Sequence, residues 1–275
     1  SGAIETIDQV YKLPFLIKIF FTTISIGSQK KINVNKTKPG EKLCIALEEM
    51  GTTFIKLGQF LATRPDIIGK ELAKSLEKLQ DKLPAFDTYQ AKKIIKKEVG
   101  EEQFKNILEL SDPIAAASIA QVHIAKIKDG NQNREVAIKI LRPDIEKLFN
   151  EELDALMLFA YIIENTVSKA KRLKLVEVVY LLREITNIEM DLRFEAAAAN
   201  ELYENTKNDK GFNVPQIYWN FTSKKILTLD KVNGISIREQ EKIREYGVDL
   251  KLLAENLIQH FLKQAVRDGF FHGDM

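Results

Sequence analysis

The chain has 275 residues, with 41 basic and 39 acidic side chains, so its formal net charge is only +2. This balance gives no indication of a nucleic-acid partner. A composition of 45% hydrophobic and 29% charged residues is typical of a globular protein of one large domain or two lobes. The single cysteine, Cys44, excludes an internal disulfide and fits a reducing compartment.

The N-terminal stretch Val10–Gly27 is apolar and aromatic, but two lysines and a proline interrupt it. It is too short and too interrupted for a membrane-spanning helix. We expect it either to lie on a bilayer surface as an amphipathic anchor or to dock on the protein body as a terminal helix. Residues 30–42 are polar and are expected to form a linker.

One helix is predicted from Leu43 to Thr63, because apolar residues recur there at helical spacing. Cys44 falls in this apolar pattern and is expected in the core. The opposite side carries a polar stripe with a single charge: Thr52, Lys56, Gln59 and Thr63. A solvated face is usually rich in Glu and Lys, so the stripe is expected to face other protein, with a solvated face as the alternative.

Two shorter helices are expected next. The first runs from about Gly69 to Gln80, before the break at Pro84. The second is bracketed by Asp87, which resembles a capping residue, and by the helix stop Gly100. Its lysines at positions 92, 93, 96 and 97 are expected to face water.

Small side chains dominate Pro113–Val122, which leads into a strand-like run, Val122–Ile127. Small residues let backbone N–H groups approach phosphate oxygens, although alanine is stiffer than glycine at such positions. A small-residue loop, a strand, a turn and a strand with an inward lysine form the layout of a kinase nucleotide lid. The alternative is a simple close-packed turn.

The lysine of this layout lies in Glu135–Leu141, an apolar run rich in β-branched residues that predicts a strand. Alternation places Val136, Ile138 and Ile140 on one face and Ala137 and Lys139 on the other. An inward lysine needs a negative partner, either a protein carboxylate, a ligand phosphate or both. The alternative is a lysine that extends from a strand edge to water.

A long helix is predicted after Arg142-Pro143, and a further helix from about Leu175 to Thr206. The second carries Glu189, Asp191 and Glu195. In one continuous helix, Asp191 and Glu195 would share a face and Glu189 would point elsewhere, so these acids could serve two different cations. Exposed helix charges are the alternative.

The C-terminal part is predicted to hold a hairpin, a connector and a helix. Residues 216–221 and 225–230 are the expected strands of the hairpin, and 231–234 leave it as a connector. A helix follows over about 250–267. Asp274, after Phe270-Phe271, is a plausible acid of a catalytic loop.

These motifs, in this order, resemble the UbiB-like family of atypical protein-kinase-like proteins, bacterial members of which serve ubiquinone biosynthesis. The resemblance covers the chain from about Lys42 to its last residue. The matched motifs are the KxGQ signature Lys56–Gln59, the alanine-rich loop Ala115–Val122, the lysine strand Val136–Lys139, the ExD motif Glu189–Asp191, Glu195, and the start of the catalytic loop, His272–Asp274.

The resemblance implies that Lys139 holds the α- and β-phosphates of ATP and pairs with Glu195, while Lys56 pairs with Glu189. Gln59 would lean into the nucleotide pocket. The implied catalytic set is Lys56, Gln59, Lys139, Glu189, Asp191, Glu195 and Asp274. The implied nucleotide contacts are Ala115, Ala116, Ala117, Ser118, Ile119, Ala120, Gln121, Val122, Ala137, Lys139, Leu229, Asp230, Lys231 and Val232.

The implied fold class is α+β, with a protein-kinase-like N-lobe of antiparallel sheet plus helices and an added N-terminal helical extension that carries the KxGQ motif. The expected segments are 1–42 as N-terminal segment and linker, 43–110 as extension, 111–234 as N-lobe with long inserted helices, and 235–275 as the start of the C-lobe. The family's magnesium ligands, an asparagine and an Asp-Phe-Gly-like motif, follow the catalytic aspartate and are absent from this sequence. We therefore expect no metal ligand in the chain, weak nucleotide binding and no turnover.

The implied function is that of an ATP-dependent atypical kinase or ATPase, a transferase that supports ubiquinone (coenzyme Q) biosynthesis. The alternative is a non-catalytic, nucleotide-gated helper that binds lipids or enzymes of the same pathway. A conventional protein kinase ranks last, because the extension would obstruct a peptide substrate. Implied partners are ATP with Mg, lipid or quinone precursors and biosynthetic enzymes. The full-length protein would associate with the cytoplasmic side of the inner membrane, with this chain itself soluble.

Overall fold

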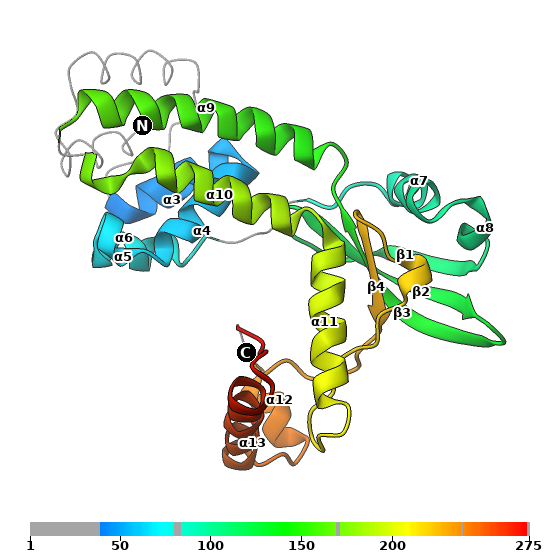
Figure 1. Cartoon of the computed structure of the whole chain (residues 1–275). Helices are drawn as coiled ribbons and strands as arrows, with labels where there is room; N and C mark the ends of the chain where they lie inside the picture. The colour runs from blue at the N-terminus through cyan, green and yellow to red at the C-terminus, as the bar shows by residue number, and fades with distance from the viewer. Residues whose placement is uncertain (1–38, 80–83, 169–170, 238, 274–275) are drawn as a thin grey trace. The chain divides into compact units, whose positions relative to one another are not determined.

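The computed structural model describes residues 39–79, 84–168, 171–237 and 239–273 (Figure 1). The described residues form two compact units. A helical unit contains 39–79, Pro84, the short loop 117–119 and most of 143–187, and a mixed unit contains 85–116, 120–142 and most of 188–273. The Val10–Gly27 segment lies outside the described residues.

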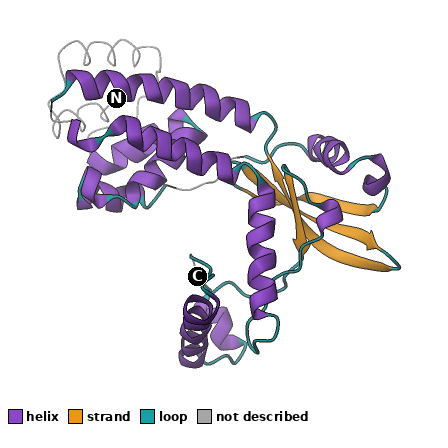
Figure 2. Ribbon diagram, viewed as in Figure 1, coloured by secondary structure: helices purple, strands orange, loops and turns teal. Residues whose placement is uncertain are grey.

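The helical unit is built from short and long helices (Figure 2). They are α3 (Pro39–Met50), α4 (Thr52–Ala62), α5 (Pro65–Ile68), α6 (Lys70–Leu76), α9 (Ile145–Thr166), the 3₁₀ turn η2 (Lys171–Leu173) and α10 (Leu175–Glu189). Two predicted boundaries are wrong. Residues 39–42 belong to α3 rather than to a linker, and the expected helix to Gln80 ends at Leu76 within the described residues.

The predicted helix from Leu43 to Thr63 is two helices, because Gly51 adopts φ 108° between α3 and α4. This left-handed value is accessible to glycine and is incompatible with a continuing helix. Gly58, inside α4, is buried where α4 meets its neighbours. A β-carbon there would lie 2.3 Å from Leu79 Cδ1 and 2.9 Å from Leu47 Cδ1, so the glycine allows close packing.

Cys44 is buried in the same cluster as Leu47, Leu76 and Leu79, and its Sγ donates a hydrogen bond to the Ser75 carbonyl at 3.0 Å. Burial raises the pKa of the Cys44 thiol above its ordinary value. Its predicted place in the core is confirmed.

The mixed unit contains a four-stranded antiparallel sheet in the order β1-β2-β3-β4, which confirms the predicted α+β class. The strands are β1 (Ile107–Ala116), β2 (Ala120–Asp129), β3 (Gln132–Leu141) and β4 (Ile226–Asp230). The other elements are α7 (Thr88–Val99), α8 (Glu101–Phe104), α11 (Leu192–Thr206), the 3₁₀ turn η3 (Trp219–Phe221), α12 (Gln240–Glu245), α13 (Leu250–Leu262) and the π-helical turn η4 (Lys263–Asp268).

One face of the sheet is a hydrophobic core covered by α7. Val136, Ile138 and Ile140 of β3 are fully buried there against Ala91 and Ile95. The cap and stop of α7 are as predicted: Asp87 accepts a hydrogen bond from the Tyr89 N–H at 3.1 Å, and the helix ends before Gly100. The outward lysines of α7 are exposed.

Several predicted elements of the mixed unit need correction. Residues 113–116, expected in a loop, belong to β1, and the loop itself is only 117–119. The first strand of the expected hairpin is reduced to a single bridge, Ile217 with Leu229, followed by η3. The helix predicted over 250–267 leaves α-helical geometry after Leu262 and continues as η4.

The helix predicted from Leu175 to Thr206 is interrupted after Glu189. Asp191 has an extended backbone and caps α11, accepting a hydrogen bond from the Arg193 N–H at 3.1 Å. The Leu192 N–H donates to the Lys224 carbonyl at 2.9 Å instead of to a helical partner. The expectation that Asp191 and Glu195 share one helix face is therefore wrong.

Candidate active site

Lys139 and Glu195 form the ion pair that the motifs predict. The Lys139 Nζ lies 2.7 Å and 2.9 Å from the two carboxylate oxygens of Glu195, on the first turn of α11. The lysine side chain is 29% exposed and the glutamate side chain 49% exposed. The pair is thus formed, but neither partner is buried, and the expectation of a buried ammonium group needs this correction.

The strand register places an apolar surface next to this lysine. Val122, Lys139 and Leu227 lie opposite one another on β2, β3 and β4. The next row of the same face contains Ile124, Ala137 and Leu229. Because paired residues point to the same side of a sheet, one row offers a cation and the next offers a small residue flanked by apolar ones. This face lies opposite the α7 core.

The alanine-rich loop joins β1 and β2 at the end of this face. Ala115 pairs with Val122 and Ala116 with Gln121, so Ala117, Ser118 and Ile119 alone form the turn. Ser118 is fully buried, and its hydroxyl has no hydrogen-bond partner within the described part of the chain. A buried unpaired hydroxyl is costly, which makes Ser118 a candidate contact for a polar ligand.

Asp230, the last residue of β4, was expected to line the adenine slot, but its side chain lies on the other face of the sheet. Asp230 lies opposite Val136, so its side chain points to the core side of the sheet. The Tyr218 hydroxyl donates to one Asp230 oxygen at 2.7 Å and the Gln216 N–H donates to the other at 3.2 Å. Burial, and then this carboxylate, raise the pKa of Tyr218 to about 12.

The side chains of the next two residues, Lys231 and Val232, differ in their contacts. Lys231 is held by an ion pair with Glu135 at 3.0 Å, and Val232 lies beyond the paired strand residues with its side chain exposed. The backbone N–H groups of Asp230 and Lys231 are bonded to the carbonyls of Gln216 and Glu135, at 3.0 Å and 3.3 Å. The tyrosine that fixes Asp230 was not expected, and no sequence spacing indicated it.

The other predicted site residues lie on different elements of the two units. Lys56 and Gln59 are half-buried on α4 of the helical unit, whereas Glu189 is half-buried in the mixed unit. The Lys56–Glu189 pair remains a prediction. Asp191 is occupied as a helix cap and by the Arg193 guanidinium at 2.6 Å, which lowers the pKa of its carboxyl group. Asp274 lies outside the described residues.

The chain that leads to the predicted catalytic loop is held by a buried glutamine. Gln264, on the π-helical turn, accepts a hydrogen bond from the His272 N–H at 3.3 Å. Arg267 of the same turn is paired with Asp209 and with Asp268, which ties η4 to the end of α11. π-Helical turns are frequent at functional sites, where they redirect side chains.

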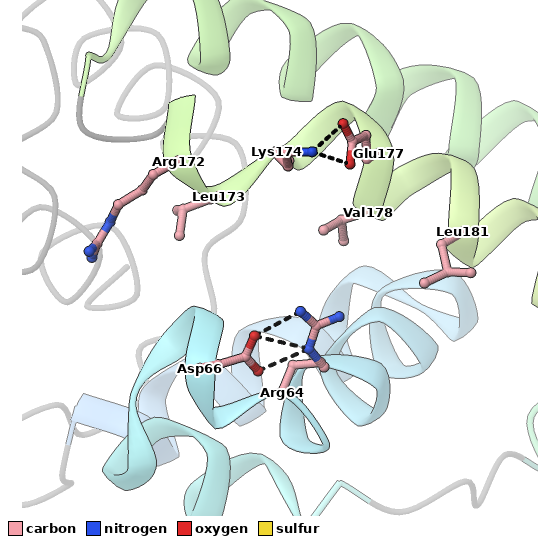
Figure 3. Close-up of a pocket in the computed structure, with 8 residues that line it drawn as sticks. All are labelled: Arg64, Asp66, Arg172, Leu173, Lys174, Glu177, Val178 and Leu181. Carbon is pink, nitrogen blue, oxygen red and sulfur yellow. Dashed lines mark hydrogen bonds and ion pairs between the residues drawn. The ribbon is translucent and has the colours of Figure 1, made fainter.

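A separate cleft of about 370 Å³ lies in the helical unit (Figure 3). Leu173, Val178 and Leu181 point toward Arg64 across it. Arg64 is paired with Asp66 and Lys174 with Glu177, so most of the charge in the cleft is already compensated. Its lining contains none of the predicted site residues.

Within the described ranges, no group of three or more His, Cys, Asp or Glu side chains is placed to bind a metal ion. None of the described helices is both long and apolar enough to span a bilayer.

An antiparallel sheet whose third strand carries a lysine paired with a helix glutamate is typical of the N-lobe of protein-kinase-like proteins. Residues 78–275 match the family model described as the ABC1 atypical kinase-like domain, and the chain belongs to that family.

Curated relatives carry the description "Probable protein kinase UbiB". The relative from Marinobacter nauticus is 38% identical over 273 residues, covering 99% of this chain and 49% of its own length. The relative from Azotobacter vinelandii is 38% identical, covering 85% of this chain and 43% of its own length. The chain thus spans about half the length of these relatives.

A solved structure, described as the complex of Rv3197 with erythromycin from Mycobacterium tuberculosis, is 23% identical with a TM-score of 0.43. It covers 82% of this chain and 50% of that chain. This likeness is too low to carry a functional argument.

Proposed function

We propose that this UbiB-type, kinase-like chain binds ATP on the half-exposed face of its sheet, beneath the alanine-rich loop. The observation that carries the proposal is the two-oxygen ion pair between Lys139 and Glu195. In kinases, the equivalent pair orients a lysine toward the α- and β-phosphates. Glu195 uses two of the three donor hydrogens of the Lys139 ammonium group, and the partial exposure of this side chain leaves the third for a ligand.

The surrounding residues suit the parts of a nucleotide. Ala137, between Ile124 and Leu229, would leave room for the base, and Lys139 in the neighbouring row would meet the phosphates. We assign the protein to ATP-dependent chemistry that supports ubiquinone biosynthesis, in line with its UbiB-named relatives. ATP supplies the phosphoryl group, and Lys139 would neutralise charge on its phosphates.

The test is a titration of the chain with Mg-ATP, followed through the amide NMR signals of residues 115–122 and 137–139. We expect saturable shifts in the wild type and none in Lys139→Ala. In Glu195→Gln we expect the dissociation constant for Mg-ATP to rise about tenfold. Lys207→Ala is the matched control, because Lys207 is ion-paired with Glu204 on the same helix as Glu195. Wild-type shifts that persist unchanged in Lys139→Ala would refute the proposal.

Turnover separates the two forms of this function. We expect the chain to release no phosphate at steady state, and release abolished by Lys139→Ala would contradict that expectation. In a full-length relative, phosphate release stimulated by lipid would support a kinase or ATPase. Nucleotide binding without release would support the non-catalytic helper.

A further inference from the structure

A closed network of polar groups lies on the core side of the sheet, directly behind the alanine-rich loop. Gln121, 1% exposed, bonds both backbone groups of Phe86: its Oε1 accepts from the Phe86 N–H at 2.8 Å, and its Nε2 donates to the Phe86 carbonyl at 3.1 Å. The same Nε2 lies 2.8 Å from Nε2 of His123, which is fully buried. The carboxamide of Gln121 therefore uses both of its donor hydrogens.

These contacts allow a single arrangement of protons. A backbone N–H can only donate, so the Gln121 oxygen must face Phe86 N and the Gln121 nitrogen must face His123. The His123 Nε2 must then accept and carry no proton. The His123 Nδ1 carries the proton and donates it to the Ser111 carbonyl at 2.8 Å. Burial lowers the pKa of the His123 imidazole, which agrees with a neutral ring.

Ser111 takes part because β1 has a bulge at this point. Leu110 pairs with Ala125 and Pro113 with His123, so Ser111 and Asp112 together lie opposite Ile124. A bulge leaves backbone groups outside the strand ladder. Here the Ser111 carbonyl serves His123, and the Ser111 hydroxyl accepts from the Ile124 N–H at 2.9 Å. The network thus joins β1, β2 and the segment before α7.

The network is placed where it can fix the loop. Gln121 belongs to the last strand pair before the turn, Ala116 with Gln121, and the next residue, Val122, lies opposite Lys139. Because strand residues alternate, Gln121 and His123 point away from the Lys139 face. Gln121 was expected among the nucleotide contacts, and the geometry gives its side chain a different role.

We propose that Gln121 and His123 are positioning residues, which hold the alanine-rich loop in one conformation from behind the sheet through a neutral, Nδ1-protonated His123. The role in nucleotide binding rests on the proposed function. Glycine-rich loops close over phosphates by flexibility, whereas alanine restricts backbone freedom. A loop of this kind needs to be pre-formed, and anchoring both of its strands achieves that at a distance from the ligand.

The first test needs no variant and no ligand. In ¹⁵N-labelled wild-type protein, long-range ¹H–¹⁵N spectra distinguish the two ring nitrogens of a histidine. We expect His123 to be neutral at pH 7, with the proton on Nδ1. A proton on Nε2, in either a neutral or a charged ring, would overturn the proposal, because it would face the Gln121 amino group.

The second test removes the hydrogen bonds of the Gln121 side chain while retaining the volume of that side chain. In Gln121→Met we expect amide exchange of residues 116–120 to accelerate by about tenfold or more, because several buried hydrogen bonds are lost together. Gln264→Met is the matched control: it removes another fully buried glutamine and should accelerate exchange at His272, leaving 116–120 unchanged. Equal exchange of residues 116–120 in Gln121→Met and wild type would overturn the proposal.

Ser111→Ala covers the case in which Gln121→Met does not fold, since it leaves Gln121 and His123 in place and removes only the two bonds of the Ser111 hydroxyl, from the Ile124 N–H and to the Asp112 carbonyl. Faster exchange at Ile124 and in residues 116–120 supports the positioning role, and unchanged exchange in residues 116–120 overturns it. The nucleotide titration then separates the two proposals. If His123 carries its proton on Nδ1 and the variants show the expected exchange, but the wild type binds no ATP, the positioning role of Gln121 and His123 stands and the proposed function fails.

Discussion

Replacing Asp191 separates its role as a helix cap from the site role that the ExD motif implies. The Asp191 side chain is 12% exposed, and its Oδ1 accepts from the Arg193 N–H at 3.1 Å. Loss of such a cap costs about 1–2 kcal/mol, so Asp191→Ala should lower the free energy of unfolding by that amount. Asp191→Asn keeps an acceptor at the cap and should cost less than about 1 kcal/mol. The bond to the exposed Arg193 side chain adds little.

The pH dependence gives a second measure of the same residue. Hydrogen bonding to the Arg193 side chain lowers the pKa of folded Asp191, so the carboxylate stabilises the fold above its unfolded pKa of about 3.9. This contribution is lost as the pH falls through the folded pKa. Urea unfolding from pH 7 to pH 3 should therefore show the difference between wild type and Asp191→Asn shrinking below about pH 4.

Two results would refute this reasoning. If Asp191→Asn destabilised the protein as much as Asp191→Ala at pH 7, the charge rather than the cap would be the stabilising feature. If Asp191→Asn abolished the ATP-induced shifts at unchanged stability, Asp191 would act in the nucleotide site, as the motif implies, in addition to capping α11.

Two further predictions concern the helical unit. Gly58→Ala should lower the urea midpoint, because the new β-carbon would meet Leu79 and Leu47 within 2.9 Å. Overpacking costs about 1–3 kcal/mol, which outweighs the roughly 1 kcal/mol gained in helix propensity. An equal or higher midpoint would contradict the close packing of α4. Cys44 should react slowly with a thiol reagent in native protein and fast in urea, because burial raises its pKa and blocks access, and rapid labelling of native protein would disprove this.

The features that could be predicted from the sequence are those set by local chemistry. Alternation in Val136–Ile140 assigned the core face and the Lys139 face of β3 correctly, because one face of the strand is buried and strand period is fixed. Asp87 and Gly100 bracketed α7 because capping depends on neighbouring backbone groups alone. The family motifs then paired Lys139 with Glu195 across 56 residues.

Features set by tertiary context were missed. Apolar periodicity runs through Gly51 and through Asp191, so it predicted continuous helices on both sides of each break. The break at Asp191 depends on the Lys224 carbonyl, which lies far along the chain. The bulges of β1, near Ser111 and Pro113, shift its register and hide the alternation that would reveal a strand.

Strand alternation also indicates on which face of β2 Gln121 lies. Gln121 and His123 have the same parity as Ala125 and Ile127, which are buried on the α7 side. That parity alone indicates that Gln121 points away from the nucleotide face. The motif match, in contrast, treats Ala115–Val122 as one unit, since it says nothing of which side chains alternate to the far side.

The partial exposure of the Lys139–Glu195 pair bears on why the chain contains it. Ion pairs this accessible to water contribute about 0–1 kcal/mol to stability, because screening and side-chain ordering offset the attraction. The sheet core beneath it, with Val136, Ile138 and Ile140 fully buried, does not depend on such a pair. A lysine fixed by two oxygens on an otherwise apolar surface therefore has little structural value, and this is the reason for proposing a negatively charged ligand at Lys139.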